Sequence, residues 1–191
     1  MILVNIIILV FKILFILAII LFLLVLLFFF SPSSIKASII GAPFLPTSKK
    51  VIRKALKLAD LKPGEKLYDL GSGTGKVLIV GAREFGADVM GMEYSTPLFI
   101  LSRINLFIHR IKNGKVYKKD FFKNDRKLNE ADVIYLFLTP KAFPKLKDKF
   151  KKELKIGTRI VVYSSPLLFW QPVKSITIEK TKIKIFLYIK K

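Results

Sequence analysis

The chain has 191 residues, with 34 Lys and Arg against 13 Asp and Glu, and a formal net charge of +21. This length fits one domain with an appendage, and the absence of cysteine excludes disulfides, thiol catalysis and Cys/His zinc sites, so no metal site is expected. The charge is compatible with nucleic acid or anionic lipid as partners, and equally with a lysine-rich composition bias that has no binding role.

Residues 1–30 form an apolar stretch whose only polar side chains are Asn5 and Lys12. Residues 13–30 are an uninterrupted apolar run of 18. About 20 such residues span the hydrocarbon core of a bilayer, whereas the apolar part of a cleaved signal peptide has roughly 7–15. The stretch is therefore predicted to be a transmembrane anchor over residues 1–30.

Basic residues follow this stretch at Lys36, Lys49, Lys50, Arg53 and Lys54, while Lys12 lies at its edge. Because positive charge favours the cytoplasmic side, the rest of the chain is predicted to lie in the cytosol, attached to the cell membrane by a single pass.

Residues 31–47 are predicted to be a juxtamembrane linker, and residues 48–191 the folded domain. Within the linker, two prolines bracket apolar side chains in the stiff segment 43–47. Thr47 or Ser48 is positioned to cap a helix over residues 49–59.

Strands and helices then alternate along the chain, which predicts a doubly wound parallel α/β sheet. A closing pair of alternating segments predicts a C-terminal hairpin and seven strands in all. The strands are expected at 66–70, 88–93, 115–119, 132–138, 159–163, 173–179 and 182–189, and the helices at 75–85, 96–111 and from Pro140 to near Gly157. The single histidine, His109, falls near a helix end, where a solvated or helix-end role is expected.

A glycine-rich turn follows the first of these strands in Leu67-Tyr68-Asp69-Leu70-Gly71-Ser72-Gly73-Thr74-Gly75, and the second strand ends at Glu93. Glycines allow a tight turn and close approach of a ligand to the backbone, and an acid at the end of the next strand can accept both ribose hydroxyls. Lys76 replaces the third glycine of the dinucleotide fingerprint, and the spacing does not fit a P-loop. The pattern predicts a site for an adenine nucleoside.

The acid-x-Gly-x-Gly-x-Gly form resembles motif I of the class I S-adenosylmethionine (SAM) methyltransferases, whose fold is Rossmann-like. The chain looks like a prokaryotic member of the membrane-anchored protein-lysine methyltransferases that act on the ATP synthase c-subunit and on adenine nucleotide translocase. The similarity covers residues 1–172 and lies in the apolar span, Pro43-Phe44-Leu45-Pro46-Thr47, the glycine turn, Gly91-Met92-Glu93, Leu101-Ser102-Arg103, Asp120-Phe121 and Tyr135-Leu136-Phe137-Leu138-Thr139-Pro140. Thr74 and Lys76 depart from the family's usual Gly-Ser-Gly-Asp-Gly-Arg.

The resemblance implies SAM as cofactor and gives roles to the motif residues. The methionine part is expected at Asp69 and the turn Gly71, Ser72, Gly73 and Gly75, the ribose at Glu93, and the adenine at Asp120 and Phe121. For Asp120, a simple turn acid is the other interpretation.

The end of the fourth strand lacks the Asp/Asn-Pro-Pro-aromatic motif with which amino-methyltransferases of nucleic acids hold a base. Its apolar and aromatic residues suit a methylated ammonium, which interacts favourably with aromatic faces. Candidates for the substrate pocket are Tyr135, Phe137 and Thr139, with Phe44 and Thr47 from a segment that could cover it; ordinary core packing is the other interpretation of Tyr135 and Phe137. No residue stands out as a catalytic base.

The predicted function is therefore a membrane-tethered SAM-dependent methyltransferase of protein lysines close to the membrane. The alternatives are methylation of a lipid amine or of RNA, and a SAM-binding membrane module without catalysis.

Overall fold

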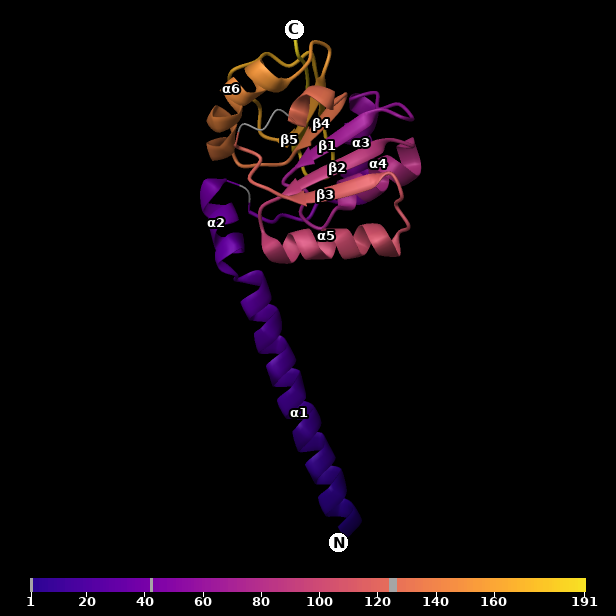
Figure 1. The fold of residues 1–191 in the computed structure, drawn as a ribbon, viewed down its shortest axis with the longest axis vertical. Helices are drawn as coiled ribbons and strands as arrows, with labels where there is room; N and C mark the ends of the chain where they lie inside the picture. Colours follow the sequence, from indigo (N-terminus) through magenta and orange to yellow (C-terminus); the bar gives the residue numbers. More distant parts are fainter. Residues whose placement is uncertain (1, 42, 124–126) are drawn as a thin grey trace.

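The computed structural model describes residues 2–41, 43–123 and 127–191 as one α/β domain with a long helix that projects from it (Figure 1). That helix, α1 (Ile2–Phe29), is apolar apart from Asn5 and Lys12, and within it Val4–Leu26 has a mean hydropathy of 3.4 and no buried part. It is long and apolar enough to cross a membrane, a property that an N-terminal signal sequence shares.

A second helix, α2 (Pro32–Ile40), lies within the segment predicted to be a juxtamembrane linker. The hydroxyl of Ser31 accepts a hydrogen bond from the amide of Ser34, proline stands in the first turn, and Gly41 ends the helix with φ of 107°. These are ordinary start and stop signals for a helix, although no helix was predicted from them. The predicted linker thus contains a regular element that the sequence analysis did not identify.

The domain is built on a seven-stranded sheet, the number of strands that the sequence predicted, and its strand order is β3-β2-β1-β4-β5-β7-β6. β7 is antiparallel to both of its neighbours, and the other paired strands are parallel. The strands are β1 (Lys66–Leu70), β2 (Asp88–Glu93), β3 (Gly114–Lys118), β4 (Val133–Leu136), β5 (Arg159–Ser164), β6 (Lys174–Thr177) and β7 (Lys184–Ile189).

Helices cover both faces of this sheet and bury a core on each side (Figure 1). On one face lie α3 (Lys49–Leu58), α4 (Lys76–Phe85) and α5 (Thr96–Ile108); on the other lie α6 (Phe143–Glu153) and the short 3-10 helices Lys127–Glu130 and Pro140–Ala142. Neighbouring residues of β1 divide between the two cores, Leu67 to one and Tyr68 to the other, because strand side chains alternate.

Several predicted elements are shorter than expected, among them β4, α5, β6, β7 and the end of α6. β4 ends at Leu136 instead of residue 138, so Phe137 and Leu138 follow the carboxyl end of the strand. α5 ends at Ile108, because His109 caps it and Arg110 has a positive φ of 53°. The Nδ1 atom of His109 lies 2.8 Å from the carbonyl oxygen of Asn105, so the helix-end role of this histidine is confirmed.

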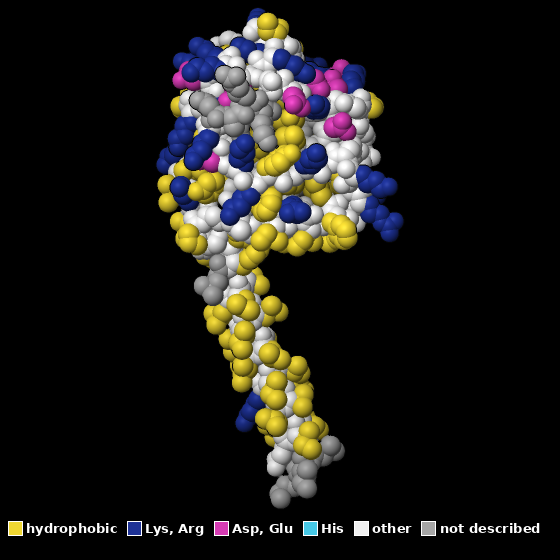
Figure 2. Space-filling model, in the orientation of Figure 1, with side chains coloured by type: hydrophobic (Ala, Val, Ile, Leu, Met, Phe, Trp, Pro, Cys, Tyr) yellow, Lys and Arg dark blue, Asp and Glu magenta, His cyan; other side chains and the backbone are white. Residues whose placement is uncertain are grey.

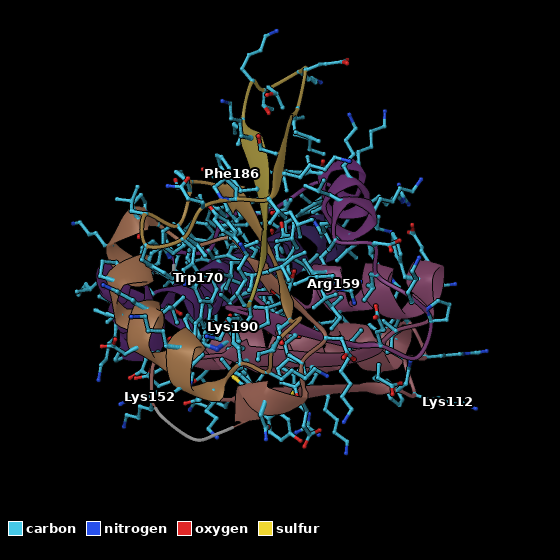
Figure 3. All side chains as sticks on the ribbon, turned by 90° about the horizontal axis from the view of Figure 1, so that it is seen from above. Lys112, Lys152, Arg159, Trp170, Phe186 and Lys190 are labelled. Atoms are coloured by element: carbon cyan, nitrogen blue, oxygen red, sulfur yellow. The ribbon has the colours of Figure 1, made fainter. Side chains whose placement is uncertain are left out.

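Basic side chains are spread around the domain instead of being gathered at one place on the face shown in Figure 2. Seen from above in Figure 3, Lys112 and Lys152 point outward on opposite sides of the domain. The ammonium of Lys190 lies 5.7 Å from the centre of the Trp170 ring. The net charge is therefore a property of the whole surface in these views.

Candidate functional site

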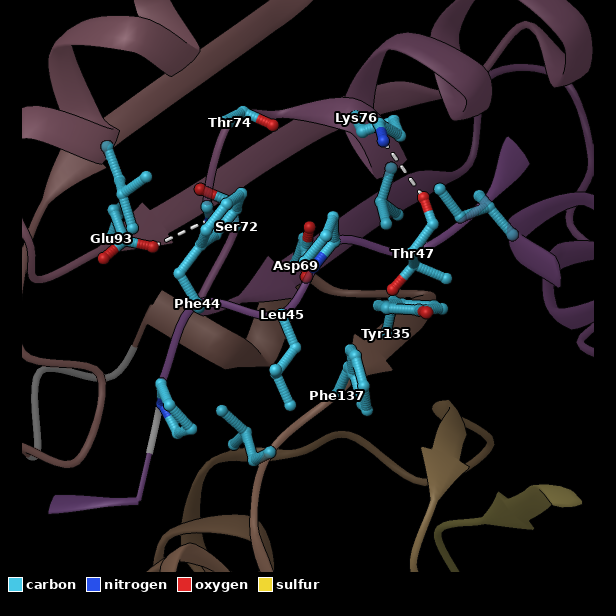
Figure 4. Close-up of a pocket in the computed structure, with 18 residues that line it drawn as sticks. Phe44, Leu45, Thr47, Asp69, Ser72, Thr74, Lys76, Glu93, Tyr135 and Phe137 are labelled. Carbon is cyan, nitrogen blue, oxygen red and sulfur yellow. Dashed lines mark hydrogen bonds between the residues drawn. The ribbon is translucent and has the colours of Figure 1, made fainter. Parts of the chain in front are cut away.

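A cavity lies at the carboxyl ends of β1, β2 and β4, where open α/β sheets bind their ligands. The residues that line it come from the turn after β1, from Glu93, from the end of β4 and from the segment 43–47, shown together in Figure 4. The structure thereby brings together most of the predicted site residues, namely Asp69, Gly71, Ser72, Gly73, Glu93, Tyr135, Phe137, Phe44 and Thr47.

The glycine turn can follow its path only without side chains at particular positions. Gly73 has φ of 55°, and a Cβ on it would lie 3.1 Å from the ring of Phe44. The amides of Gly71 and Ser72 both donate to the carbonyl oxygen of Met92, at 2.9 and 3.1 Å. The turn is thus fixed to the end of β2 and presents bare backbone to the cavity.

Glu93 connects this turn to the start of α5. One carboxylate oxygen accepts from the amide of Gly73 and the other from the amide of Ser95, both at 2.8 Å. Burial raises the pKa of Glu93, and the backbone amides oppose that shift. Each oxygen can accept a further hydrogen bond, so two ribose hydroxyls can still be held here.

Asp69 is the most strongly perturbed acid of the site. It is buried at the end of β1, and burial followed by the negative charge of Glu93 raises its pKa well above the usual range. A cation beside Asp69 would offset much of the free-energy cost of ionising this buried carboxyl, because opposite charges favour the ionised carboxylate. The position therefore suits a ligand that carries an amine.

The segment 43–47 forms one wall of the cavity and is held there by Lys76, whose ammonium donates to the carbonyl oxygen of Thr47 at 3.1 Å (Figure 4). Lys76 is one of the two departures from the family's usual motif, and this contact gives it a role. Beneath the segment, burial and the charge of Asp69 raise the pKa of Tyr135. The Thr47 side chain lies close to the Tyr135 hydroxyl but outside hydrogen-bond geometry, so this hydroxyl has no partner among the described residues.

A second recess, of about 110 Å³, adjoins the cavity and shares Phe137 and Leu45 with it. The ring of Phe137 packs against that of Tyr163, with centroids 4.7 Å apart. At the mouth of the recess Ser164 has a positive φ of 89°, a strained backbone for a residue with a side chain. The recess thus lies next to the cavity, and Phe137 and Leu45 form part of the wall of both.

Four predicted site residues do not line the cavity. The α4 cap Gly75 packs against α5, where a Cβ would lie 2.5 Å from the Ser102 hydroxyl oxygen, and Thr139 lines the recess while its amide and hydroxyl both bond to the Gly41 carbonyl oxygen at 3.0 Å. Asp120 accepts from the amide of Phe122 at 3.1 Å, and Phe121 is buried in the core. The turn-acid interpretation of Asp120 describes this geometry, and the adenine role of these last two stays a prediction.

Sequence reasoning missed Lys76, Tyr163 and Ser164 as site residues. Lys76 was seen only as a departure from the usual motif. Tyr163 and Ser164 end β5, next to β4 in the sheet, so the strand order combined with the rule for carboxyl ends could have indicated them.

Comparison with known proteins places this site in a family. The profile of the ANTKMT methyltransferase domain matches residues 69–174. A protein-lysine N-methyltransferase of Saccharolobus islandicus is 33% identical over 155 residues, which is 77% of this chain and 92% of that protein. The chain belongs to the ANTKMT methyltransferase domain family. It is a SAM-dependent methyltransferase, as the sequence motifs predicted.

Two further relatives bear on the family. The adenine nucleotide translocase lysine N-methyltransferase of mouse is 31% identical over 69% of this chain and 56% of that protein. The crystal structure of an RNA methyltransferase from Salinibacter ruber in complex with S-adenosyl-L-homocysteine has a TM-score of 0.72 and 30% identity, covering 76% of this chain and 93% of that chain. The predicted Rossmann-like class I fold is thereby confirmed.

The side chains of the ANTKMT-family site fit SAM, and one segment takes up part of the space. Asp69 can receive the methionine amine and Glu93 the ribose hydroxyls, while the buried hydroxyl of Ser72 has no partner among the described residues. The enclosed space, however, is only about 60 Å³, whereas pockets for small molecules have roughly 300–1,000 Å³. The ring of Phe44 lies against Gly73 within that space. An outward shift of the segment 43–47 would therefore make more room for the cofactor.

Proposed function

We propose that this methyltransferase is held at a membrane by α1 and methylates lysine side chains of proteins close to that membrane surface. The observation that carries the substrate class is the likeness to the protein-lysine N-methyltransferase of Saccharolobus islandicus, which extends over 92% of that protein. The mouse relative, named for adenine nucleotide translocase, supports a membrane-associated protein as the target.

The recess beside the cavity supports a lysine substrate. Thr139, Ser164 and Ser165 line part of it. Phe137, Leu45 and two prolines form its apolar side, with Tyr163 behind Phe137, so a chain of methylene groups can lie along them. Burial among such groups lowers the pKa of an amine, and the neutral amine is the nucleophile in methyl transfer. Aromatic faces also attract an ammonium that has gained methyl groups.

The roles of the chain's own residues follow from their positions. Asp69 and Glu93 orient the two ends of the cofactor's ribose-methionine part, and the 43–47 segment closes over them and excludes water. When bound, SAM supplies a methyl group on a positively charged sulfur. Tyr135 and Phe137 line the space between this group and the recess, so they align the incoming amine. Alignment of this kind contributes much of the acceleration of a two-reactant step.

Helix α2 sets the proposed reach of the enzyme. An extended chain over residues 31–42 would reach about 40 Å, but the nine residues of α2 rise only about 14 Å as a helix. The cavity begins at Pro43, directly after α2. Target lysines are therefore expected within a short distance of the membrane surface, in a layer set by α2.

The orientation of the tether is a second part of the proposal. Lys36, Lys49 and Lys50 follow α1, and positive flanks favour the cytosolic side, where SAM is available. A reporter enzyme fused after Lys191 is expected to be active only in its cytosolic form. Activity of the exported form would refute the orientation.

RNA is the second candidate substrate, because the Salinibacter ruber structure that covers most of this chain is described as an RNA methyltransferase. The charge of +21 is compatible with it. Against it stands the end of β4, where Phe137-Leu138-Thr139-Pro140 offers no polar side chain pattern for a base amine.

The test is labelling of membranes, membrane lipids and RNA with tritiated SAM and the full chain. We expect label in membrane protein, on lysine after hydrolysis. Label in phospholipid or RNA alone would overturn the substrate class.

Deleting residues 1–30 tests the tether, and Ser31 is kept because it caps α2. We expect labelling of the membrane target to fall about 10²- to 10⁴-fold, while a soluble peptide with the same lysine is methylated as before, because a tether raises the effective target concentration. As the matched control, an unrelated apolar helix of the same length in place of α1 should restore labelling. Unchanged labelling after deletion would contradict the tether.

A further inference from the structure

The outer face of α5 is strongly apolar although it is exposed. Ile100, Ile104, Phe107 and Ile108 are 40%, 45%, 84% and 64% exposed, and their spacing places them on one side of the helix. The opposite side packs on the domain through buried residues such as Leu106. We call these four residues the apolar face of α5.

This face lies on the side of the domain from which α1 projects. In Figure 1, α5 runs across the base of the domain beside the α1–α2 junction, and Figure 2 shows apolar side chains along this base. The junction is attached to the first turn of α5: the Ser33 hydroxyl accepts from the amide of Thr96 at 3.0 Å, and the hydroxyls of Ser34 and Ser95 lie 2.7 Å apart. The start of α5 is thus held beside the end of α1.

We propose that α5 is an interfacial helix whose apolar face rests in the headgroup region of the same bilayer that α1 crosses. The inference rests on the proposed membrane tether, which brings the domain to the surface. An amphipathic helix binds an interface by burying its apolar side about 5–10 Å into the headgroup and acyl boundary. With 13 residues, α5 lays about 20 Å of helix along that surface.

Charge favours a lipid surface as the occupant. The one charged residue of α5 is Arg103, which is exposed, and α5 carries no acid that would repel anionic headgroups. Residues 31–191 carry 33 basic and 13 acidic residues, a net charge of +20 that attracts an anionic leaflet. On α2, Ile35 and Ile39 are 50% and 73% exposed, so further apolar surface adjoins the junction.

A second copy of the chain fits this face less well. A stable protein interface uses about 20–30 residues a side, and the apolar face of α5 offers four. A bilayer needs no matching surface shape, and the bilayer that α1 is proposed to cross lies directly beside this face. Contact with that bilayer would also fix the domain against rotation about the tether, because a helix lying flat on the surface adds a second line of contact.

The absence of cysteine in this chain allows single labels to be placed at chosen sites. We would prepare the full chain as Phe107→Cys, Ile104→Cys, Ile16→Cys in the middle of α1, and Lys191→Cys at the far end of the domain, each carrying a nitroxide, in liposomes containing anionic lipid. Collision with oxygen, which concentrates in lipid, and with a polar nickel complex, which stays in water, reports the surroundings of each label.

For the labels on α5 we expect higher accessibility to oxygen than to nickel, at a shallower depth than the Ile16→Cys label. The Lys191→Cys label should show the reverse preference. Nickel accessibility at Phe107→Cys and Ile104→Cys equal to that at Lys191→Cys would overturn the inference while an inserted Ile16→Cys label upholds the tether. Protection of the α5 labels from both reagents would overturn it in favour of a protein contact. A water-exposed Ile16→Cys label would refute the tether itself, and the α5 labels then decide the surface contact separately.

Discussion

The replacement of Asp69 by asparagine should change cofactor binding and stability in opposite directions. The carboxyl is buried, and its pKa is raised by burial and by Glu93. A folded-state pKa above the unfolded value means that this group favours folding below about pH 4, and that the contribution is lost as the pH rises through the folded pKa. At pH 7.5 the native acid therefore destabilises the empty domain, and Asp69→Asn should raise its unfolding temperature.

Cofactor binding should weaken in the same variant. A hydrogen bond between the carboxylate and the methionine amine contributes about 1.5–3 kcal/mol, which corresponds to an affinity loss of roughly 10- to 150-fold. Because only the ionised carboxyl pairs with the amine, the affinity of the native chain should also fall as the pH is lowered toward 5, and Asp69→Asn should flatten this dependence.

Calorimetric titration with SAM and thermal unfolding followed by circular dichroism measure the two effects. Asp88→Asn is the matched control, because it makes the same chemical change at an exposed acid at the start of β2 and should alter neither quantity. An Asp69→Asn variant that binds SAM as tightly as the native chain would refute the assignment of the amine. A lowered unfolding temperature would show that the carboxylate stabilises the empty domain, contrary to the reasoning above.

Three further outcomes are expected. Glu93→Ala leaves the buried amides of Gly73 and Ser95 without partners, so denaturant unfolding should show a loss of about 2–6 kcal/mol besides weaker SAM binding; a loss below 1 kcal/mol would contradict this. Tyr135→Phe removes a buried hydroxyl without a partner among the described residues, so the unfolding temperature should hold or rise, and a fall would reveal a missed hydrogen bond. Ser33→Ala removes the hydroxyl that caps the start of α5 and should lower the free energy of unfolding by about 0.5–2 kcal/mol. Ser38→Ala, on the exposed side of α2, is the control, and an equal loss in both variants would contradict the capping role of Ser33.

The turn after β1 and the end of β2 could be predicted because their chemistry is local. Glycines and acids follow apolar runs there, and parallel strands bring their carboxyl ends to one edge. The position of Phe44 on Gly73 could not be predicted, because it depends on how a distant segment packs. The same holds for Lys76, whose partner is a backbone carbonyl 29 residues away.

Helix α2 was not predicted from the sequence, for a different reason. Ser31, Pro32 and Gly41 are local start and stop signals, and no helix was predicted from them. The docking of Ser33 onto Thr96 is a tertiary contact between residues 63 apart, which sequence patterns alone do not reveal. β4 was predicted too long because its apolar run continues past the end of strand pairing into the wall of the site.

The attachment of α2 at both ends limits how the chain can vary. At its start Ser33 and Ser34 bond to α5, and at its end the carbonyl oxygen of Gly41 accepts two hydrogen bonds from Thr139. Inserting or deleting one residue in a helix turns everything beyond it by about 100°. Inserting or deleting one residue within α2 would therefore prevent the contacts with α5 at its start and the contact with Thr139 at its end from forming together. The segment between α1 and the domain is therefore expected to accept substitutions more readily than insertions or deletions.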